Sequence, residues 1–171
     1  MSGFDVTDLP AASHPTVGDQ APDFTRPLVS DEYWEDVSLV TLVEDAPVVL
    51  VFFPMDGTGN AKYTWIEIRE RGWGIGEETA TVVGLSISTP YEHKAFIDRH
   101  NLPYRLFSDP ENAIAQEYNV VHDHDGMAGI VGARPAVFVI DDSRTVQYAW
   151  AADEWPELPQ FDAIEAAVET C

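Results

Sequence analysis

Residues 48–53 constrain the fold of this chain more than any other segment. The run reads Val-Val-Leu-Val-Phe-Phe, and no polar residue interrupts it. An apolar run of this length is far too short to cross a bilayer. It is typical of a strand that is buried on both faces, and such strands occur in sheets that carry helices above and below. A sheet between two helical layers is therefore expected.

Strand-like and helix-like segments alternate along the rest of the chain. Two further apolar runs, Ala80–Ser88 and Ala136–Ile140, predict buried strands. Thr145–Ala151 follows a turn at 141–143 and alternates in side-chain character, which predicts a hairpin partner for the strand before it. Strands that alternate with helices indicate an α/β domain with a central mixed β-sheet flanked by helices.

Residues typical of helix starts occur between these strands. The clearest start is at Thr89, where Pro90 suits the first helical position and Glu92 can close a capping box. The expected helices are Thr58–Gly72, 89–101, one opening at Asp109-Pro110, and Phe161–Glu169. Residues 1–16 show no periodicity and are interpreted as a flexible N-terminal segment, and residues 17–171 as a single domain.

The charge of the chain excludes two classes of partner. Asp and Glu number 30 against 9 Lys and Arg, which gives a net charge of −21. Such a field repels nucleic acid and anionic membranes, so neither partner is expected. Scarce lysine and dispersed acid indicate adaptation to high salt, where screening relieves the self-repulsion. The acidic N-terminus carries no secretory signal, so a soluble, cytoplasmic protein is expected.

The single cysteine narrows the chemistry further. Cys171 is the last residue, so the chain can form neither an intramolecular disulfide nor a cysteine metal cluster. The segment His122-Asp123-His124-Asp125 has metal-ligating residue types, but adjacent residues of an extended segment point to alternate faces. A solvated loop is the favoured interpretation, and we expect no metal and no cofactor.

Several local strings, taken in order, resemble one protein family. The resemblance is to the peroxiredoxins of the alkyl hydroperoxide reductase and thiol-specific antioxidant group, covers roughly residues 17–169, and implies a thioredoxin-like fold. It rests on Val17–Phe24, Phe52–Thr58, Ser86–Phe96, Leu102–Asp109 and Pro135–Asp141, of which the third and fourth resemble the family's next strand, helix and following loop.

The family's defining residue is missing from its place. Peroxiredoxin chemistry needs a thiolate at a helix N-terminus in the pattern Pro-x-x-x-Thr-x-x-Cys. Pro54 and Thr58 match this pattern, but Ala61 occupies the cysteine position. The family's nearby glutamate and the resolving cysteine of some members are replaced by Thr64 and Ile66. Alanine cannot form a sulfenic acid, so the resemblance implies a family site without its nucleophile.

The remote arginine of the family is displaced as well. The resemblance puts that arginine three residues before Phe138, where this chain has Pro135, with Arg134 shifted by one. A slip of one residue in a strand sends a side chain to the other face. Whether the Arg134–Pro135 peptide bond is cis is left open by the sequence.

Two explanations of Ala61 compete, and each carries its own function. In the favoured one, alanine is native and the chain is a peroxiredoxin-like binding or interaction module without peroxidase activity. In the other, alanine replaces the cysteine of a thiol peroxidase that reduces hydroperoxides. The resemblance also implies a homodimer formed around residues 55–61.

Overall fold

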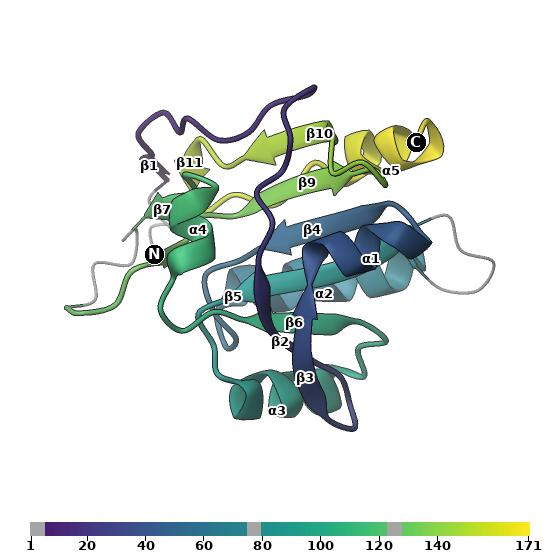
Figure 1. Ribbon diagram of the computed structural model, residues 1–171. Coiled ribbons are helices and arrows are strands. Elements are labelled where there is room, and N and C mark those ends of the chain that lie inside the picture. Colours follow the sequence, from purple (N-terminus) through teal and green to yellow (C-terminus); the bar gives the residue numbers. More distant parts are fainter. Residues whose placement is uncertain (1–5, 75–79, 123–127) are drawn as a thin grey trace.

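A seven-stranded mixed sheet forms the centre of the computed structural model, which describes residues 6–74, 80–122 and 128–171. The strand order is β10-β9-β4-β5-β6-β2-β3 (Figure 1). β4, β5 and β6 run parallel, and all other pairings are antiparallel. The strands are β2 (Thr25–Val29), β3 (Trp34–Ser38), β4 (Val48–Phe52), β5 (Thr81–Ser86), β6 (Arg105–Ser108), β9 (Ala136–Ile140) and β10 (Val146–Ala151).

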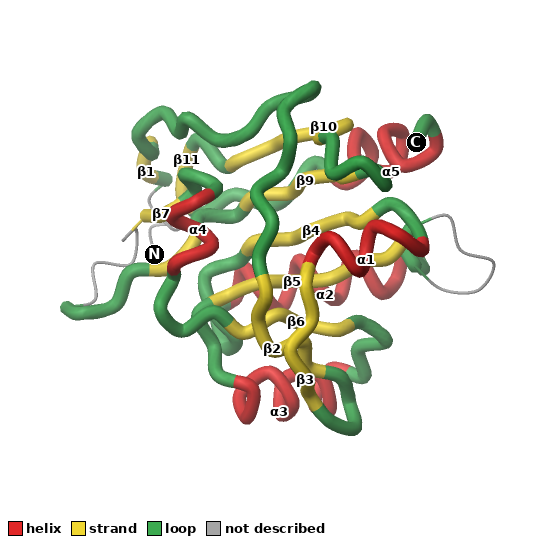
Figure 2. The backbone as a smooth tube through the Cα atoms, in the orientation of Figure 1, coloured by secondary structure: helices red, strands yellow, loops and turns green. Residues whose placement is uncertain are grey.

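Helices cover both faces of this sheet, which confirms the predicted α/β architecture. α1 and α4 lie on the front face in Figure 1, whereas α2 and α5 lie behind it. The same two layers are visible when the chain is coloured by secondary structure (Figure 2). The helices are α1 (Leu39–Asp45), α2 (Gly59–Arg71), α3 (Pro90–His100), α4 (Ala113–Glu117) and α5 (Phe161–Glu169).

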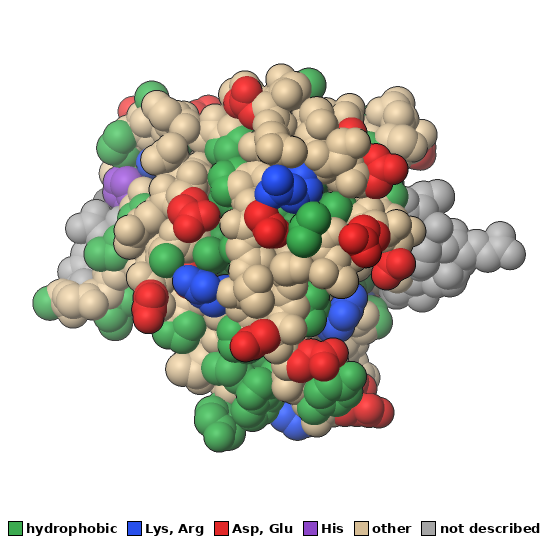
Figure 3. Space-filling model, viewed as in Figure 1, with side chains coloured by type: hydrophobic (Ala, Val, Ile, Leu, Met, Phe, Trp, Pro, Cys, Tyr) green, Lys and Arg blue, Asp and Glu red, His purple; other side chains and the backbone are tan. Residues whose placement is uncertain are grey.

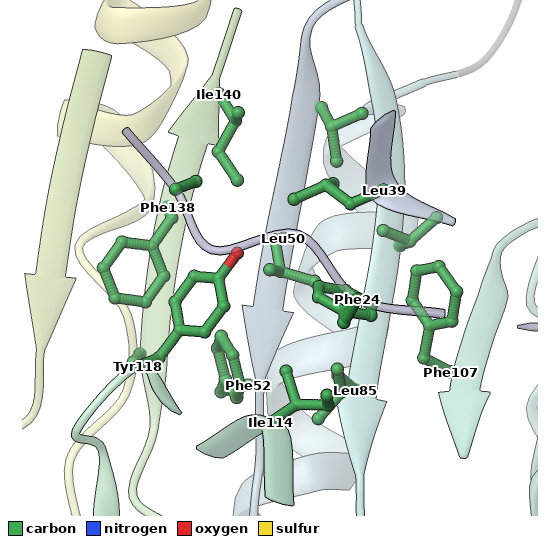
Figure 4. Close-up of a cluster of buried hydrophobic side chains, with 14 of the residues drawn as sticks. Phe24, Leu39, Leu50, Phe52, Leu85, Phe107, Ile114, Tyr118, Phe138 and Ile140 are labelled. Carbon is green, nitrogen blue, oxygen red and sulfur yellow. The ribbon is translucent and has the colours of Figure 1, made fainter. Parts of the chain in front are cut away.

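The central strand β4 explains why two helical layers are needed. All five of its residues are buried, and alternate side chains enter two separate cores. Leu50 and Phe52 join the front core with α1 and α4, where Phe52, Tyr118 and Phe138 form a ring cluster (Figure 4). The opposite core contains side chains from α2, α3 and α5, Trp65 among them.

The helix predicted at Asp109-Pro110 starts later than expected. α4 begins at Ala113, because Asp109 is occupied in another way. Its carboxylate accepts hydrogen bonds from the backbone N–H of Ile114 and from Arg26. Asn112 adopts a left-handed conformation with φ 59° just before the helix. The helix predicted from Thr89 is confirmed with its capping box and with Pro90 at its start.

The segment Leu102–Asp109, interpreted from the resemblance as part of a loop, contains strand β6. Residues 105–108 pair with β5 on one side and with β2 on the other. The sequence pattern predicts no particular strand or helix within residues 17–47, whereas the structure places β2, β3 and α1 there. β2 and β3 complete the end of the sheet furthest from β10, and α1 packs into the front core.

Two short ladders lie outside the main sheet. β1 (Thr7–Asp8) pairs with β11 (Glu154–Trp155), and β7 (Val121–His122) pairs with β8 (Gly132–Ala133). The N-terminal segment therefore makes specific contacts in its described part. The 155–156 peptide bond is cis, and it is the only cis bond within the described ranges.

On the face of the molecule seen in Figure 3, the acidic side chains are dispersed rather than gathered in one patch. Figure 3 shows red carboxylate side chains scattered over the whole visible face, with a few blue cations between them. No helix in the part of the chain that the structure describes is long and apolar enough to cross a membrane.

Candidate functional site

Thr58 caps the N-terminus of α2 and fixes the turn that carries Ala61. Its backbone is extended, with φ −77° and ψ 150°, as an N-cap residue requires. Its Oγ1 accepts a hydrogen bond from the Ala61 backbone N–H at 3.1 Å and donates one to the Met55 carbonyl at 3.0 Å. The helix terminus is thus built as the sequence predicts, with free N–H groups and partial positive charge.

Ala61 itself lies in an apolar setting. Its exposed fraction is 0%, and it belongs to the core behind the sheet together with Phe53 and Trp65. The rings of Phe53 and Trp65 meet edge to face with centroids 5.8 Å apart. The Thr64 side chain, in the family's glutamate position, is also buried, and its Oγ1 has no hydrogen-bond partner. This turn offers no ionisable side chain at the position of the family nucleophile.

A buried ion-pair contact holds the loop before α2. His93 on α3 is fully buried, and its Nδ1 lies 2.8 Å from Oδ2 of Asp56. Its Nε2 lies 2.9 Å from the Phe107 carbonyl oxygen of β6. A carbonyl only accepts, so Nε2 donates there, and the proton between Nδ1 and Oδ2 joins the ring to the carboxylate. The Asp56 backbone N–H also donates to Oγ of Ser88 at 2.9 Å.

Sequence reasoning missed this contact because it treated His93 as an ordinary helix residue. The available signal is its position four residues after Thr89, which is the N-cap of α3. The periodicity of that helix puts this position on the same face as the buried Phe96 and Ile97. A histidine on a buried helix face needs polar partners for both ring nitrogens. The identity of those partners depends on the fold and cannot be read locally.

The far end of α2 is tied to the C-terminal helix by charge. Arg71 contacts Asp162 at 2.8 Å and Glu165 at 3.0 Å on α5, as well as Glu67 one turn earlier on α2. Its hydrogen bonds to these carboxylates, that to Asp162 above all, raise the pKa of the guanidinium. The indole of Trp73 also donates to Glu165. These contacts hold the C-terminal end of α2 against α5. Arg71 therefore lies at the opposite end of α2 from Ala61.

Pro135 and Arg134 separate at the start of β9. Ala136 pairs with Phe52, so Pro135 lies at the end of the sheet where β4 leads into the α2 loop. The Arg134 side chain turns to the other face, where Nη1 donates to the carbonyls of Pro10 at 2.7 Å and Ala152 at 3.2 Å. Burial lowers the pKa of this guanidinium. The Arg134–Pro135 bond is trans.

The remaining thiol lies at the other end of the molecule. Cys171 follows α5, and the carboxylate of Asp141, just beyond the end of β9, is near enough to affect it. Pro135 precedes the start of that strand, so the length of β9, roughly 16 Å, separates Asp141 from the family site. Partial desolvation and Asp141 raise the pKa of the Cys171 thiol. This thiol is therefore poorly suited to act as a nucleophile.

The histidine–aspartate segment considered for metal binding falls mostly outside the described residues. His122 ends β7, and residues 123–125 belong to the part that is not described. Within the described ranges, no group of three or more His, Cys, Asp and Glu side chains is arranged to hold a metal ion.

Comparison with known proteins gives concordant results. A sequence model of the AhpC/TSA family matches residues 17–149. The chain is 33% identical over 140 residues to peroxiredoxin Q, chloroplastic, of Gentiana triflora, covering 82% of this chain and 61% of that protein. It is 30% identical over 135 residues to the putative peroxiredoxin bcp of Coxiella burnetii, covering 78% and 87%. The chain thus spans about three fifths of the length of the first relative.

Solved structures agree with the sequence matches. Peroxidoxin BcpB from Mycobacterium tuberculosis superposes with a TM-score of 0.75 at 25% identity, over 92% of this chain and 96% of that one. AhpC of Enterococcus faecalis has the same fold, with a TM-score of 0.77 at 18% identity over 91% and 92%. The thioredoxin-like fold is thereby confirmed. From the matched family model and these relatives, the chain belongs to the AhpC/TSA family of peroxiredoxins.

Proposed function

We propose that this chain is a peroxiredoxin-family protein without thiol peroxidase activity that acts as a binding or interaction module. The observation that carries the proposal is the methyl group of Ala61 at the capped N-terminus of α2, fully buried among apolar side chains. Peroxide reduction by a thiol begins when a thiolate attacks one peroxide oxygen, forms an S–O bond and breaks the O–O bond. A methyl group has no electron pair for this attack.

The other groups around this turn support the same proposal. The family's remote position is Pro135, and the neighbouring Arg134 binds backbone carbonyls on the opposite face. Cys171 has a raised pKa, so little thiolate is present at neutral pH.

One observation favours the alternative, a peroxidase whose cysteine has been replaced by alanine. The capping hydrogen bonds of Thr58 to Ala61 and Met55 persist. These are the contacts that would present a side chain at position 61 to the helix N-terminus. A chain that had long lost its chemistry would be under no pressure to keep this turn, except for helix stability.

The experiment is a hydroperoxide-consumption assay with a dithiol reductant on four proteins. These are the chain itself, Cys171→Ser, Ala61→Cys, and the double variant Ala61→Cys with Cys171→Ser. We expect the first two to consume peroxide at the same background rate. Consumption by the unaltered chain above the Cys171→Ser control would overturn the proposal. Rapid turnover by the double variant would instead favour a replaced cysteine, and the codon for residue 61 in the gene decides that point.

We also propose that the chain forms a homodimer through the region around the α2 loop. Tyr63 on α2 is 62% exposed and Tyr91 on α3 is 76% exposed, and exposed aromatic side chains are enriched at protein interfaces. Light scattering after gel filtration tests this, and Tyr63→Glu is expected to shift the protein to monomer. A monomeric mass for the unaltered chain at micromolar concentration would contradict the proposal.

A further inference from the structure

A hollow lies on the face of the sheet opposite α2, between the N-terminal segment and α4. Its volume is about 500 Å³. Its lining includes Pro10 and Ala12 of the N-terminal segment, Gln116 and Asn119 at the end of α4, His122 of β7, and Arg134. We call it the Arg134 hollow. The residues that line it are far apart in sequence. Figure 1 shows α4 and β7 close together at this edge of the molecule, near β1 and β11.

Arg134 is a buried cation that no carboxylate of the described residues contacts directly. The charge of Asp153 acts on it from a longer distance and raises its pKa, against the larger lowering by burial. Only 4% of its surface is exposed, and its partners are two neutral carbonyl groups. Nε is buried with no hydrogen-bond partner. Nη2 makes no hydrogen bond either and is not among the fully buried atoms, so it keeps some contact with solvent. Among the residues that the structure describes, no carboxylate forms an ion pair with this guanidinium.

The missing partner is notable because carboxylates are abundant elsewhere. The chain has 30 acidic residues, and Arg26 and Arg71 both have carboxylate partners at 3.0 Å or less. A buried charge is costly unless it is paired, and an unpaired one calls for a physical explanation. The bonds from Nη1 to Pro10 and Ala152 explain why an arginine side chain lies here. They do not neutralise its charge.

We propose that the Arg134 hollow binds a small organic carboxylate. Nη2 can donate to a carboxylate oxygen, which brings a negative charge into direct contact with the guanidinium in a charge-assisted hydrogen bond. Pro10 and Ala12 offer apolar surface to the body of such a molecule. The side-chain amide of Asn119 donates to the Ser13 carbonyl, so its oxygen remains free to accept from a ligand hydroxyl or amide.

The surroundings favour a monoanion over a phosphate. The net charge of −21 repels a dianion about twice as strongly as a monoanion. Gln116 lies in the last turn of α4 and Asn119 just beyond it, at the end of the helix that carries partial negative charge. One guanidinium without a lysine or a helix N-terminus is a poor match for three phosphate oxygens. The site does not depend on the chemistry at Ala61, so failure of either proposal leaves the other intact.

The test is an NMR titration of the full chain with benzoate at constant ionic strength. The reporters are the Arg134 Nε–H signal and the side-chain amide of Asn119. We expect both to shift saturably with benzoate and less with inorganic phosphate at equal concentration. Shifts that never saturate, or tighter binding of phosphate than of benzoate, would overturn the proposal.

Two variants separate the site from general electrostatics. Gln116→Glu places a carboxylate on the wall of the hollow without touching Arg134 and is expected to weaken benzoate at least about threefold. Gln160→Glu makes the same charge change at the start of α5 on the opposite face and is expected to leave the affinity unchanged. Equal effects of the two would mean that only net charge matters, and the proposal would fail.

Arg134→Met removes the anchor and is expected to weaken binding about tenfold or more. If this variant folds and binds benzoate as tightly as the unaltered chain, the guanidinium is not the anchor and the proposal is wrong. If it does not fold, Gln116→Glu against Gln160→Glu decides the matter alone.

Discussion

The two faces of the sheet differ in how they pair two buried ionisable side chains, His93 and Arg134. Behind the sheet, the turn around Ala61 satisfies its helix terminus with Thr58, and the nearby His93 is paired with Asp56. In front of the sheet, Arg134 is held by carbonyl groups, and Asp153 acts on its charge only from a distance. The family's reactive position thus carries an uncharged side chain, whereas a guanidinium without a contacting carboxylate lies on the other side of the sheet. A one-residue displacement before β9 is enough to move an arginine from one face to the other.

The largest expected loss of stability comes from breaking the Asp56–His93 contact behind the sheet. Asp56→Ala leaves the fully buried His93 without its carboxylate, and removing one member of a buried ion pair costs about 3–5 kcal/mol of unfolding free energy. Urea unfolding measures it. Asp98→Ala, which removes an exposed contact to Lys94, is the matched control and should cost less than about 1 kcal/mol. Similar losses for both variants would mean that the buried contact is not special.

A smaller loss of stability is expected from replacing Arg134 in front of the sheet. Arg134→Met leaves the Pro10 and Ala152 carbonyls without their donor, which costs about 1–3 kcal/mol. The apolar Met fills part of the space, so the loss stays below that of Asp56→Ala. Urea unfolding of the two variants side by side tests the ranking. A larger loss for Arg134→Met would reverse the contrast between the faces.

The N-cap of α2, Thr58, should contribute less to stability than either of these contacts. Thr58→Ala removes the acceptor for the Ala61 backbone N–H and should destabilise the protein by about 1 kcal/mol. Thr89→Ala, at the cap of α3, should cost a similar amount. Thermal unfolding measures both. A much larger cost at Thr58 would show that the turn does more than end a helix.

The smallest expected effect is a pH dependence behind the sheet. Burial first, and then Lys62, lower the pKa of His100 below its ordinary value of 6.5. The unfolded chain therefore binds the proton more readily, so the stability from this residue is present above about pH 6.5 and is lost as the pH falls. Unfolding free energies at pH 7.5 and 5.5 should differ less in His100→Gln than in the unaltered chain. An identical pH slope in both proteins would contradict this.

The sequence predicted those parts of the fold that depend on a few adjacent residues. The apolar run of β4 and the capping box at Thr89 each depend on a few adjacent residues, and both were confirmed. Strand β6 was missed because its four residues become a strand only by pairing with β5 and β2. The start of α4 was misplaced because Asp109 binds Arg26, which lies 83 residues away.

The candidate site follows the same division. The helix α2 was predicted from its own residues, but with Thr58 as part of the helix, whereas Thr58 is its N-cap. The Asp56–His93 contact could not be predicted, because it joins a loop to a helix 37 residues later. The surroundings of Arg134 depend on where the N-terminal segment lies, and no local pattern encodes that position.

The β1–β11 ladder has a consequence for the order in which the molecule opens. It joins Thr7 to Trp155, near the two ends of the chain, through only two residues on each strand. Closing so long a loop for so few hydrogen bonds makes this ladder late to form and early to open. The N-terminal segment that lines the Arg134 hollow directly follows β1. α4, which lines the hollow from the other direction, is packed into the front core through Ile114 and Tyr118. We therefore expect backbone amide hydrogens to exchange slowly in α4 and fast in the N-terminal segment. A molecule that binds between the two should slow hydrogen exchange in the N-terminal segment alone.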